Sequence, residues 1–160
     1  MELNQLEIGM DLILWRHADA EDGVPDAGRK LTAKGEKQAR LMGEWLKENL
    51  PAKFRVIASP TQRTQQTAQA LIKSFETVKS IAPGADASAV LVAAGWPDPQ
   101  GTVVVVGHQP TLGRIAALLL SGVEADWSIK KGSIWWFSNR VRQEMPQTVL
   151  RVMMTPEYLK

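Results

Sequence analysis

Both histidines of the chain stand where a buried strand is expected to end. His17 follows Arg16 directly after the apolar segment 12–15, and His108 comes just after the β-branched segment 102–106. Runs of Ile, Leu and Val without polar alternation are typical of strands buried on both faces of a parallel sheet. Because open α/β sheets bind their ligands at the carboxyl ends of such strands, these side chains are candidate functional residues.

Arg63 is a further candidate at a third strand end. It lies in the first turn of a helix expected after the strand-like segment 54–58. If the three strands are neighbours, two guanidinium groups and two imidazoles face one pocket. Guanidinium groups bind phosphate oxygens through paired N–H groups, and two helix N-termini at the same edge would add backbone donors. A pocket for a carboxylate ligand is the competing interpretation, but no other convergent group favours it.

Two arginines and two histidines around one phosphate could catalyse phosphoryl transfer. That reaction depends mainly on in-line positioning and on neutralising the charge of the transferring oxygens. One imidazole could attack phosphorus in its neutral form, which nearby cations favour, and give a phosphohistidine that water hydrolyses. A metal site is the other use of two histidines. The chain lacks an i, i+4 pair and an obvious third ligand, so we expect no metal and no other cofactor.

Strands alternate with helices along most of the chain. The expected strands are 12–16, 54–58, 77–82 and 102–106, and the expected helices are 33–49, one beginning after 59, 87–94 and 111–120. Segments 133–138 and 148–153 look like an antiparallel pair, joined by a connection at 139–147 that holds no helix. Right-handed crossovers then predict a three-layer αβα sandwich, whose mainly parallel sheet has an antiparallel edge from the C-terminal strands.

Capping residues mark several helix ends. Thr32 is a fair N-cap for the first long helix, and Gly122 closes the last one. Ser59, followed by Pro60 and by Gln62 three residues after the cap, forms a capping-box pattern. The helix that carries Arg63 is therefore expected to begin at the end of the second strand.

The composition indicates one globular domain over residues 1–160. Residues 1–9 show no clear period and are an N-terminal extension, an upstream start or a small added edge. A net charge of +2 is too small for a nucleic-acid surface, and no apolar run approaches the roughly 20 residues of a membrane span. The absence of cysteine excludes a disulfide framework and a thiolate nucleophile, and the N-terminus lacks a signal pattern. We expect a cytoplasmic, monomeric protein that binds neither nucleic acid nor membrane.

Four short motifs in this order and spacing resemble the histidine phosphatase superfamily, whose fold is like that of phosphoglycerate mutase. Within it the chain is similar to the small bacterial SixA-type phosphohistidine phosphatases. The matching pieces are segments 14–20 and 29–35, Ser59-Pro60 with Arg63, Gln66 and Thr67, and segment 106–110. The resemblance runs from about Met10 to the C-terminus.

The resemblance implies that His17 is the phosphorylated nucleophile and that Arg16, Arg63 and His108 form the phosphate pocket with it. Ala18 stands where the first motif usually has glycine. Larger relatives place an acidic residue in the middle of the chain as the general acid. Here the candidates are Asp86, which also suits a helix N-cap, and Asp19, two residues past the expected nucleophile.

The missing strong acid favours a phosphorylated histidine as substrate, since imidazole is a better leaving group than an alkoxide. A chain of 160 residues has no room for a large lid, so the site should admit a phosphorylated protein side chain. We therefore expect a metal-independent phosphohistidine phosphatase that acts on phosphorylated proteins through phospho-His17. The alternatives are a broad-specificity small-molecule phosphomonoesterase and a non-catalytic phosphate or phosphoprotein binding module.

Overall fold

Strands and helices alternate as the apolar periods predict, and the computed structural model describes them over residues 8–98 and 101–160. The sheet has the order β3-β2-β4-β1-β5-β6. Its strands are β1 (Ile8–Arg16), β2 (Arg55–Ala58), β3 (Glu76–Thr77), β4 (Thr102–Gly107), β5 (Ile134–Arg142) and β6 (Met145–Met154). The helices are α2 (Ala33–Asn49), α3 (Gln62–Gln69), α4 (Ala87–Ala94) and α5 (Thr111–Ser121), with 3₁₀ turns η1 (Asp26–Gly28), η2 (Lys79–Ile81) and η3 (Pro156–Tyr158).

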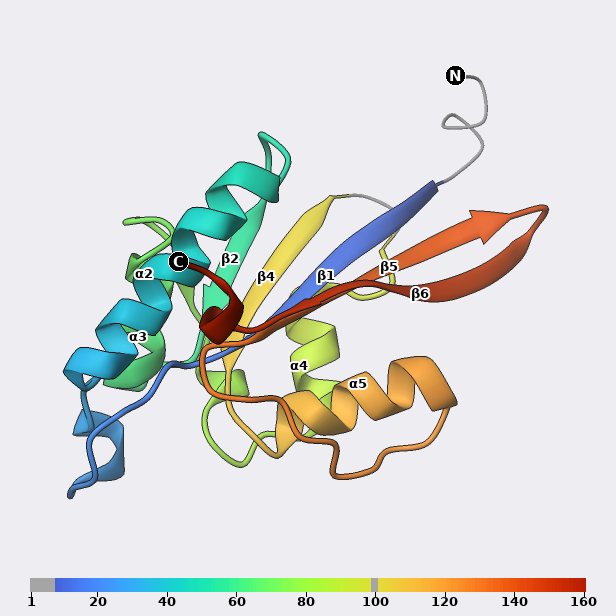
Figure 1. Ribbon diagram of the computed structural model, residues 1–160. Coiled ribbons are helices and arrows are strands. Elements are labelled where there is room, and N and C mark those ends of the chain that lie inside the picture. The colour runs from blue at the N-terminus through green and yellow to red at the C-terminus, as the bar shows by residue number, and fades with distance from the viewer. Residues whose placement is uncertain (1–7, 99–100) are drawn as a thin grey trace.

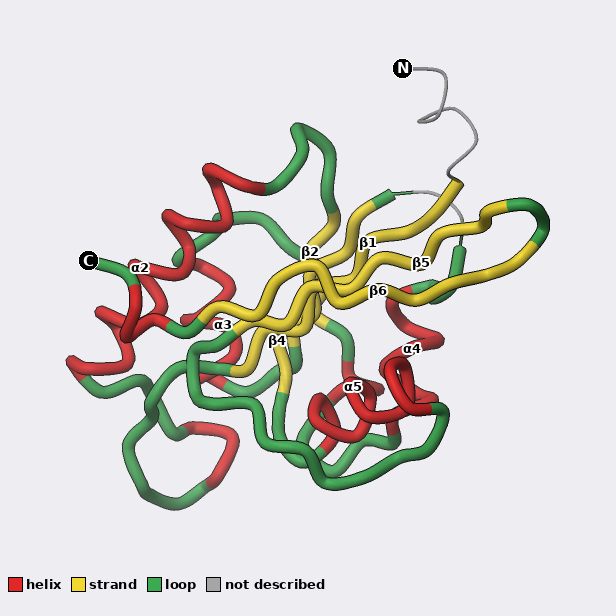
Figure 2. Tube along the Cα trace, turned by 45° about the vertical axis from the view of Figure 1, so that its right-hand side comes forward, coloured by secondary structure: helices red, strands yellow, loops and turns green. Residues whose placement is uncertain are grey.

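The two central strands separate two hydrophobic cores. In β1, Leu12 and Leu14 pack on one side of the sheet, and Ile13 and Trp15 pack on the other. Helices α4 and α5 cover the first side, while α2 and α3 cover the second (Figure 1). The sheet runs between these helix pairs as the middle layer (Figure 2). The three-layer αβα arrangement expected from the sequence is therefore confirmed, and burial on both faces explains why β1 and β4 lack polar alternation.

Parallel pairing brings three strand ends to one edge of the sheet. Strand β4 pairs in parallel with β1, where Arg16 lies opposite Gly107, and with β2, where Ala58 lies opposite Val106. Strands β5 and β6 form the antiparallel edge that the sequence predicts. The neighbouring strands required for a common pocket are therefore present.

The predicted caps have mixed outcomes. The Thr32 side chain accepts a hydrogen bond from the Gly35 N–H, and Gly122 ends α5 with a left-handed φ of 83°. The prediction of a capping box at Ser59 is wrong, because Thr61 caps α3 by accepting a hydrogen bond from the N–H of Thr64. The Ser59 hydroxyl bonds instead to His108, which is remote in sequence.

Two segments differ from the sequence prediction in their bounds. Of segment 77–82 only Thr77 is in a strand, since β3 ends there opposite Ala58, the last residue of β2, and Lys79–Ile81 form the 3₁₀ turn η2. The connection expected at 139–147 lies mostly within β5 and β6. These strands continue to a two-residue turn at Gln143 and Glu144, whose φ angles are 49° and 66°. Positive φ at both residues is typical of a tight hairpin turn.

At the N-terminus, Ile8 and Gly9 belong to β1 and pair with Val141 and Arg140 of β5. The rest of the expected N-terminal extension lies outside the described residues. In the part of the chain that the structure describes, no helix is long and apolar enough to span a membrane.

Candidate active site

The two imidazoles lie side by side at the edge where β1 and β4 end. The ring centroids of His17 and His108 are 5.4 Å apart, and the ring planes meet at 55°. Both side chains are buried. The β1–β4 register produces this pairing, since both histidines leave the sheet at the same level. The structure thus brings together the two histidines that the sequence analysis singled out.

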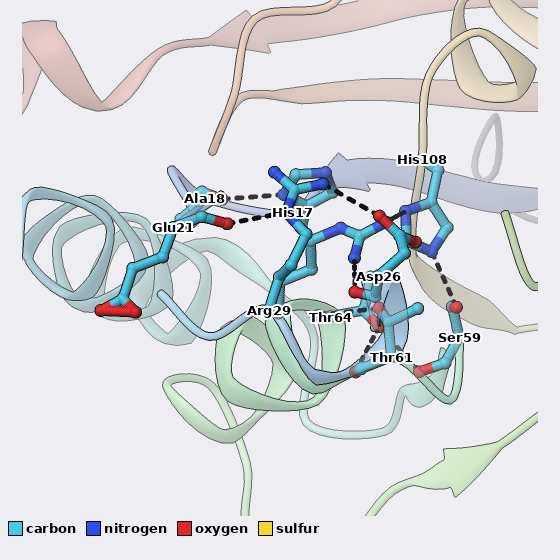
Figure 3. A network of polar contacts seen from close by, with 10 residues as sticks. His17, Ala18, Glu21, Asp26, Arg29, Ser59, Thr61, Thr64 and His108 are labelled. Carbon is cyan, nitrogen blue, oxygen red and sulfur yellow. Dashed lines mark hydrogen bonds and ion pairs between the residues drawn. The ribbon is translucent and has the colours of Figure 1, made fainter. Parts of the chain in front are cut away.

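The His17 ring has a defined tautomer and a lowered basicity. Its Nδ1 lies 2.8 Å from the carbonyl oxygen of Ala18, which can only accept a hydrogen bond, so Nδ1 carries the proton and Nε2 keeps its lone pair (Figure 3). The pKa of His17 is lowered to about 4, mainly by burial and also by the charges of Arg63 and Arg16, while the bond to Ala18 opposes this shift. A neutral imidazole with a free Nε2 is suited to nucleophilic attack.

Arg63 reaches His108 from the first turn of α3. Its Nη2 lies 3.5 Å from Nδ1 of His108. It also donates from Nη1 to the carbonyl oxygen of Asp26 at 2.9 Å and from Nη2 to Oδ2 of Asp26 at 3.1 Å. The Nε–H of Arg63 is buried and has no acceptor among the described residues. One N–H of this buried cation is therefore left for a ligand.

Arg16 is held in a similar way. Its Nη1 donates to the carbonyl oxygen of Ile129 at 2.8 Å, while its buried Nε–H has no acceptor in the described ranges. Its charge acts on both imidazoles, because it contributes to the lowered pKa of His17 and of His108. Two guanidinium groups, each with a buried Nε–H that has no acceptor in the described ranges, next to two neutral imidazoles, fit a tetrahedral oxyanion.

His108 is fixed through both ring nitrogens. Its Nε2 lies 2.8 Å from Oγ of Ser59 (Figure 3). Because the guanidinium of Arg63 can only donate, Nδ1 of His108 is the unprotonated nitrogen and Nε2 donates to Ser59. The pKa of His108 is lowered to about 3, mainly by burial and also by the neighbouring His17 and Arg63, while Asp26 opposes this shift.

Backbone contacts connect the nucleophile segment to the rest of the site. Thr67 of α3 accepts a hydrogen bond from the N–H of Ala18 at 3.1 Å and donates to the carbonyl of Arg63 at 2.8 Å. The N–H of Gly132 donates to the carbonyls of Arg16 and His17. The end of β1 is thus fixed from α3 and from the segment before β5.

The two general-acid candidates lie in different surroundings. The Asp19 carboxylate accepts a bond from Thr32 at 2.7 Å and pairs with Lys131 at 3.0 Å, and both contacts hold its pKa below the usual range. An ionised carboxylate with two donors is a poor proton donor. Asp86 is exposed at the N-cap position of α4, and its side chain makes no capping bond. The geometry favours neither residue as an acid.

Two residues beside the pocket escaped the sequence analysis. Asp26 contacts Arg63 directly, and Arg29 pairs with Asp26 at 3.1 Å and donates to the carbonyl of Glu21 (Figure 3). Segment 29–35 drew attention as a motif, but it gave no role to Arg29. Within the described residues, no group of three or more histidine or acidic side chains could hold a metal ion.

Comparison with known proteins agrees with this geometry. Residues 12–84 match the family model of the histidine phosphatase superfamily (branch 1). The phosphohistidine phosphatase SixA of Escherichia coli is 32% identical over 122 residues, which cover 71% of this chain and 76% of that protein. The SixA homolog of Haemophilus influenzae is 32% identical over 126 residues, which cover 69% and 77%.

A solved structure shows the same fold. The protein histidine phosphatase SixA complexed with tungstate aligns with a TM-score of 0.74 and 26% identity, covering 93% of this chain and 99% of that one. The chain therefore belongs to the histidine phosphatase superfamily and is a phosphatase. Within that superfamily it is of the SixA type, as the four sequence motifs predicted.

Proposed function

We propose that this phosphatase removes the phosphoryl group from phosphorylated histidines of a protein, through a covalent intermediate on His17 and without a metal. The observation that supports this most is the pairing of His17 with His108 beside two arginines, Arg16 and Arg63, whose buried Nε–H groups have no acceptor among the described residues. Tungstate, which the related SixA structure holds, is a tetrahedral oxyanion like phosphate. The named function of the Escherichia coli relative supports the same substrate class.

The proposed reaction has two displacements at phosphorus. Nε2 of His17 attacks in line, forms a P–N bond, and the electron pair of the breaking bond returns to the leaving group. Arg16 and Arg63 neutralise the charge of the phosphoryl oxygens. The carbonyl of Ala18 stabilises the imidazolium that forms, because it already accepts the proton on Nδ1. Water then attacks phosphorus, inorganic phosphate leaves, and His17 returns to its neutral form.

The access route suits a protein substrate. The segment 21–28, which borders the site, is exposed along its length. A phosphorylated side chain on another protein could approach across it without displacing a helix or strand.

The test compares substrates and traps the intermediate. The purified chain is offered a ³²P-labelled phosphohistidine protein, a phosphohistidine peptide and a panel of phosphate esters, with and without a chelator. We expect faster turnover of phosphohistidine, no effect of the chelator, and an acid-labile label on the wild-type chain that is lost in His17→Ala. A label that persists in His17→Ala would refute the nucleophile.

Two other outcomes would replace the proposal. A strong preference for esters would indicate the broad-specificity phosphomonoesterase. Phosphate binding without turnover of any substrate would indicate the binding module.

For the trapping experiment, His108→Ala serves as the matched control, because it removes the other buried imidazole and leaves the proposed nucleophile in place.

A further inference from the structure

Asp26 is an acidic residue that contacts the cationic pocket directly. It begins η1, in the loop between β1 and α2. Its Oδ2 accepts from Nη2 of Arg63 and its Oδ1 accepts from Nη1 of Arg29, both at 3.1 Å. Its backbone carbonyl accepts a third bond, from Nη1 of Arg63 at 2.9 Å. The loop therefore presents one carboxylate between two arginines. The displacement proposed above gives this carboxylate no role.

The exposure of these side chains places Asp26 at the mouth of the pocket. The residues His17 and His108 are 7% and 4% exposed, and the Arg63 side chain is 5% exposed, but the Asp26 side chain is 59% exposed. In an in-line displacement the leaving group lies opposite the nucleophile. Because a protein-bound phosphohistidine enters from solvent, its imidazole lies on the outer side of the phosphoryl group. The exposed Asp26 carboxylate, which bonds to Arg63 of the pocket, also lies on the solvent side of the site.

Among these arginines, the imidazole that leaves the substrate needs a negatively charged group close to it. It departs as a neutral molecule only if its unphosphorylated nitrogen carries a proton when the P–N bond breaks. Three arginines surround the site, and their charges lower the pKa of His17. They disfavour a protonated substrate imidazole in the same way. Hydrogen bonds from Arg29 and Arg63 hold the pKa of Asp26 below its usual range, so this carboxylate is ionised. It can therefore accept a hydrogen bond from an N–H group.

We propose that Asp26 determines specificity for phosphohistidine by accepting a hydrogen bond from the protonated, unphosphorylated ring nitrogen of the substrate imidazole. This inference rests on the proposed function. In the first displacement the P–N bond to His17 forms and the P–N bond of the substrate breaks. The electron pair goes to the substrate nitrogen that carried phosphorus, and the proton stays on the other nitrogen. A neutral imidazole leaves, and Asp26 remains ionised throughout.

The test measures kcat/KM of Asp26→Asn on two substrates. One is a phosphohistidine peptide, and the other is p-nitrophenyl phosphate, whose leaving group departs without a proton. We expect the value for phosphohistidine to fall about tenfold more than the value for p-nitrophenyl phosphate, as loss of one hydrogen bond to a charged group predicts. Asp26→Glu should restore part of the difference. Asp22→Asn is the matched control, an exposed acid of the same loop, and should leave the ratio unchanged.

Two results overturn the inference and can be told apart. If Asp26 only orients Arg63, both values fall by the same factor in Asp26→Asn, and the specificity role is refuted while the proposed function stands. If the wild-type chain does not hydrolyse phosphohistidine, the proposed function fails and the inference fails with it.

Discussion

The hydroxyl of Ser59 lies 2.8 Å from Nε2 of His108, and both residues are buried. This contact orients the second imidazole of the site from the end of β2. It also explains why a serine with a good capping sequence does not cap a helix.

Replacing Ser59 by alanine should therefore impair the site. Ser59→Ala leaves the buried Nε2–H of His108 without an acceptor, which costs about 1–3 kcal/mol of folding free energy. We expect kcat/KM to fall about tenfold, measured on any accepted phosphate substrate, and Ser59→Thr to restore most of it. Ser133→Ala is the control, because Oγ of that buried serine has no partner among the described residues. Equal effects of Ser59→Ala and Ser133→Ala would contradict the assigned role.

Replacing Arg63 by lysine tests the guanidinium geometry. Arg63→Lys keeps the charge but removes the Nε–H and the paired donors to Asp26. We expect kcat/KM to fall on the order of 10²-fold, the loss typical for one donor to a transition-state oxyanion. Arg55→Lys is the control, since Arg55 is exposed and pairs with Glu76 away from the pocket. Activity of Arg63→Lys close to that of Arg55→Lys would show that charge alone suffices.

The two buried histidines predict a pH-dependent stability. Burial lowers the pKa of His17 to about 4 and that of His108 to about 3, from an ordinary value of 6.5. Below pH 6.5 the unfolded chain therefore binds more protons than the folded one, and the free energy of unfolding falls as the pH is lowered. Urea unfolding at about pH 7.5 and pH 5 should show this loss.

A histidine variant provides the control for that measurement. His108→Asn removes one titrating group and should make the pH dependence shallower. Asp19 and Asp26 lose their stabilising contribution only at lower pH, because their pKa values lie below the ordinary carboxyl range. Equal stability at about pH 7.5 and pH 5 would contradict neutral, buried histidines.

Replacing Gly35 tests how closely α2 packs against the loop that follows His17. A Cβ at this position would overlap the carbonyl oxygen of Asp19. We expect Gly35→Ala to lower the free energy of unfolding by about 1–3 kcal/mol and the melting temperature by several degrees. In Gly28→Ala the nearest atom to the added Cβ is Cγ of Pro25 at 3.6 Å, so this variant should be nearly neutral. A stable Gly35→Ala variant would mean that the loop shifts easily.

Apolar runs made most of the fold predictable. Segment 102–106 is buried throughout, and the period of 111–120 with Gly122 beyond it matches α5 closely. The order of the strands was harder, because hydrophobicity does not encode which buried strand pairs with which. The sequence could therefore predict that Arg16, Arg63 and the two histidines meet only on the assumption that their strands are neighbours.

Polar contacts between distant segments account for what the sequence could not predict. Ser59 and Thr61 offer the same capping chemistry, but Thr61 caps α3 and Ser59 bonds to His108, which is remote in sequence. Asp26 is an exposed turn residue without a periodic pattern, so its contact with Arg63 follows from the fold alone. The hairpin of β5 and β6 was predicted too short because its polar residues obscure the strand pattern.

The exposed segment 21–28 borders a pair of histidines held at the ends of buried strands. Apart from Asp26, whose carboxylate bonds to Arg63, substitutions on this exposed segment should change the folding free energy by less than about 0.5 kcal/mol. Mutation and selection can therefore reshape this rim during evolution while the buried chemistry is inherited unaltered. Gene duplicates of this enzyme could diverge in the molecules they recognise through changes in one loop.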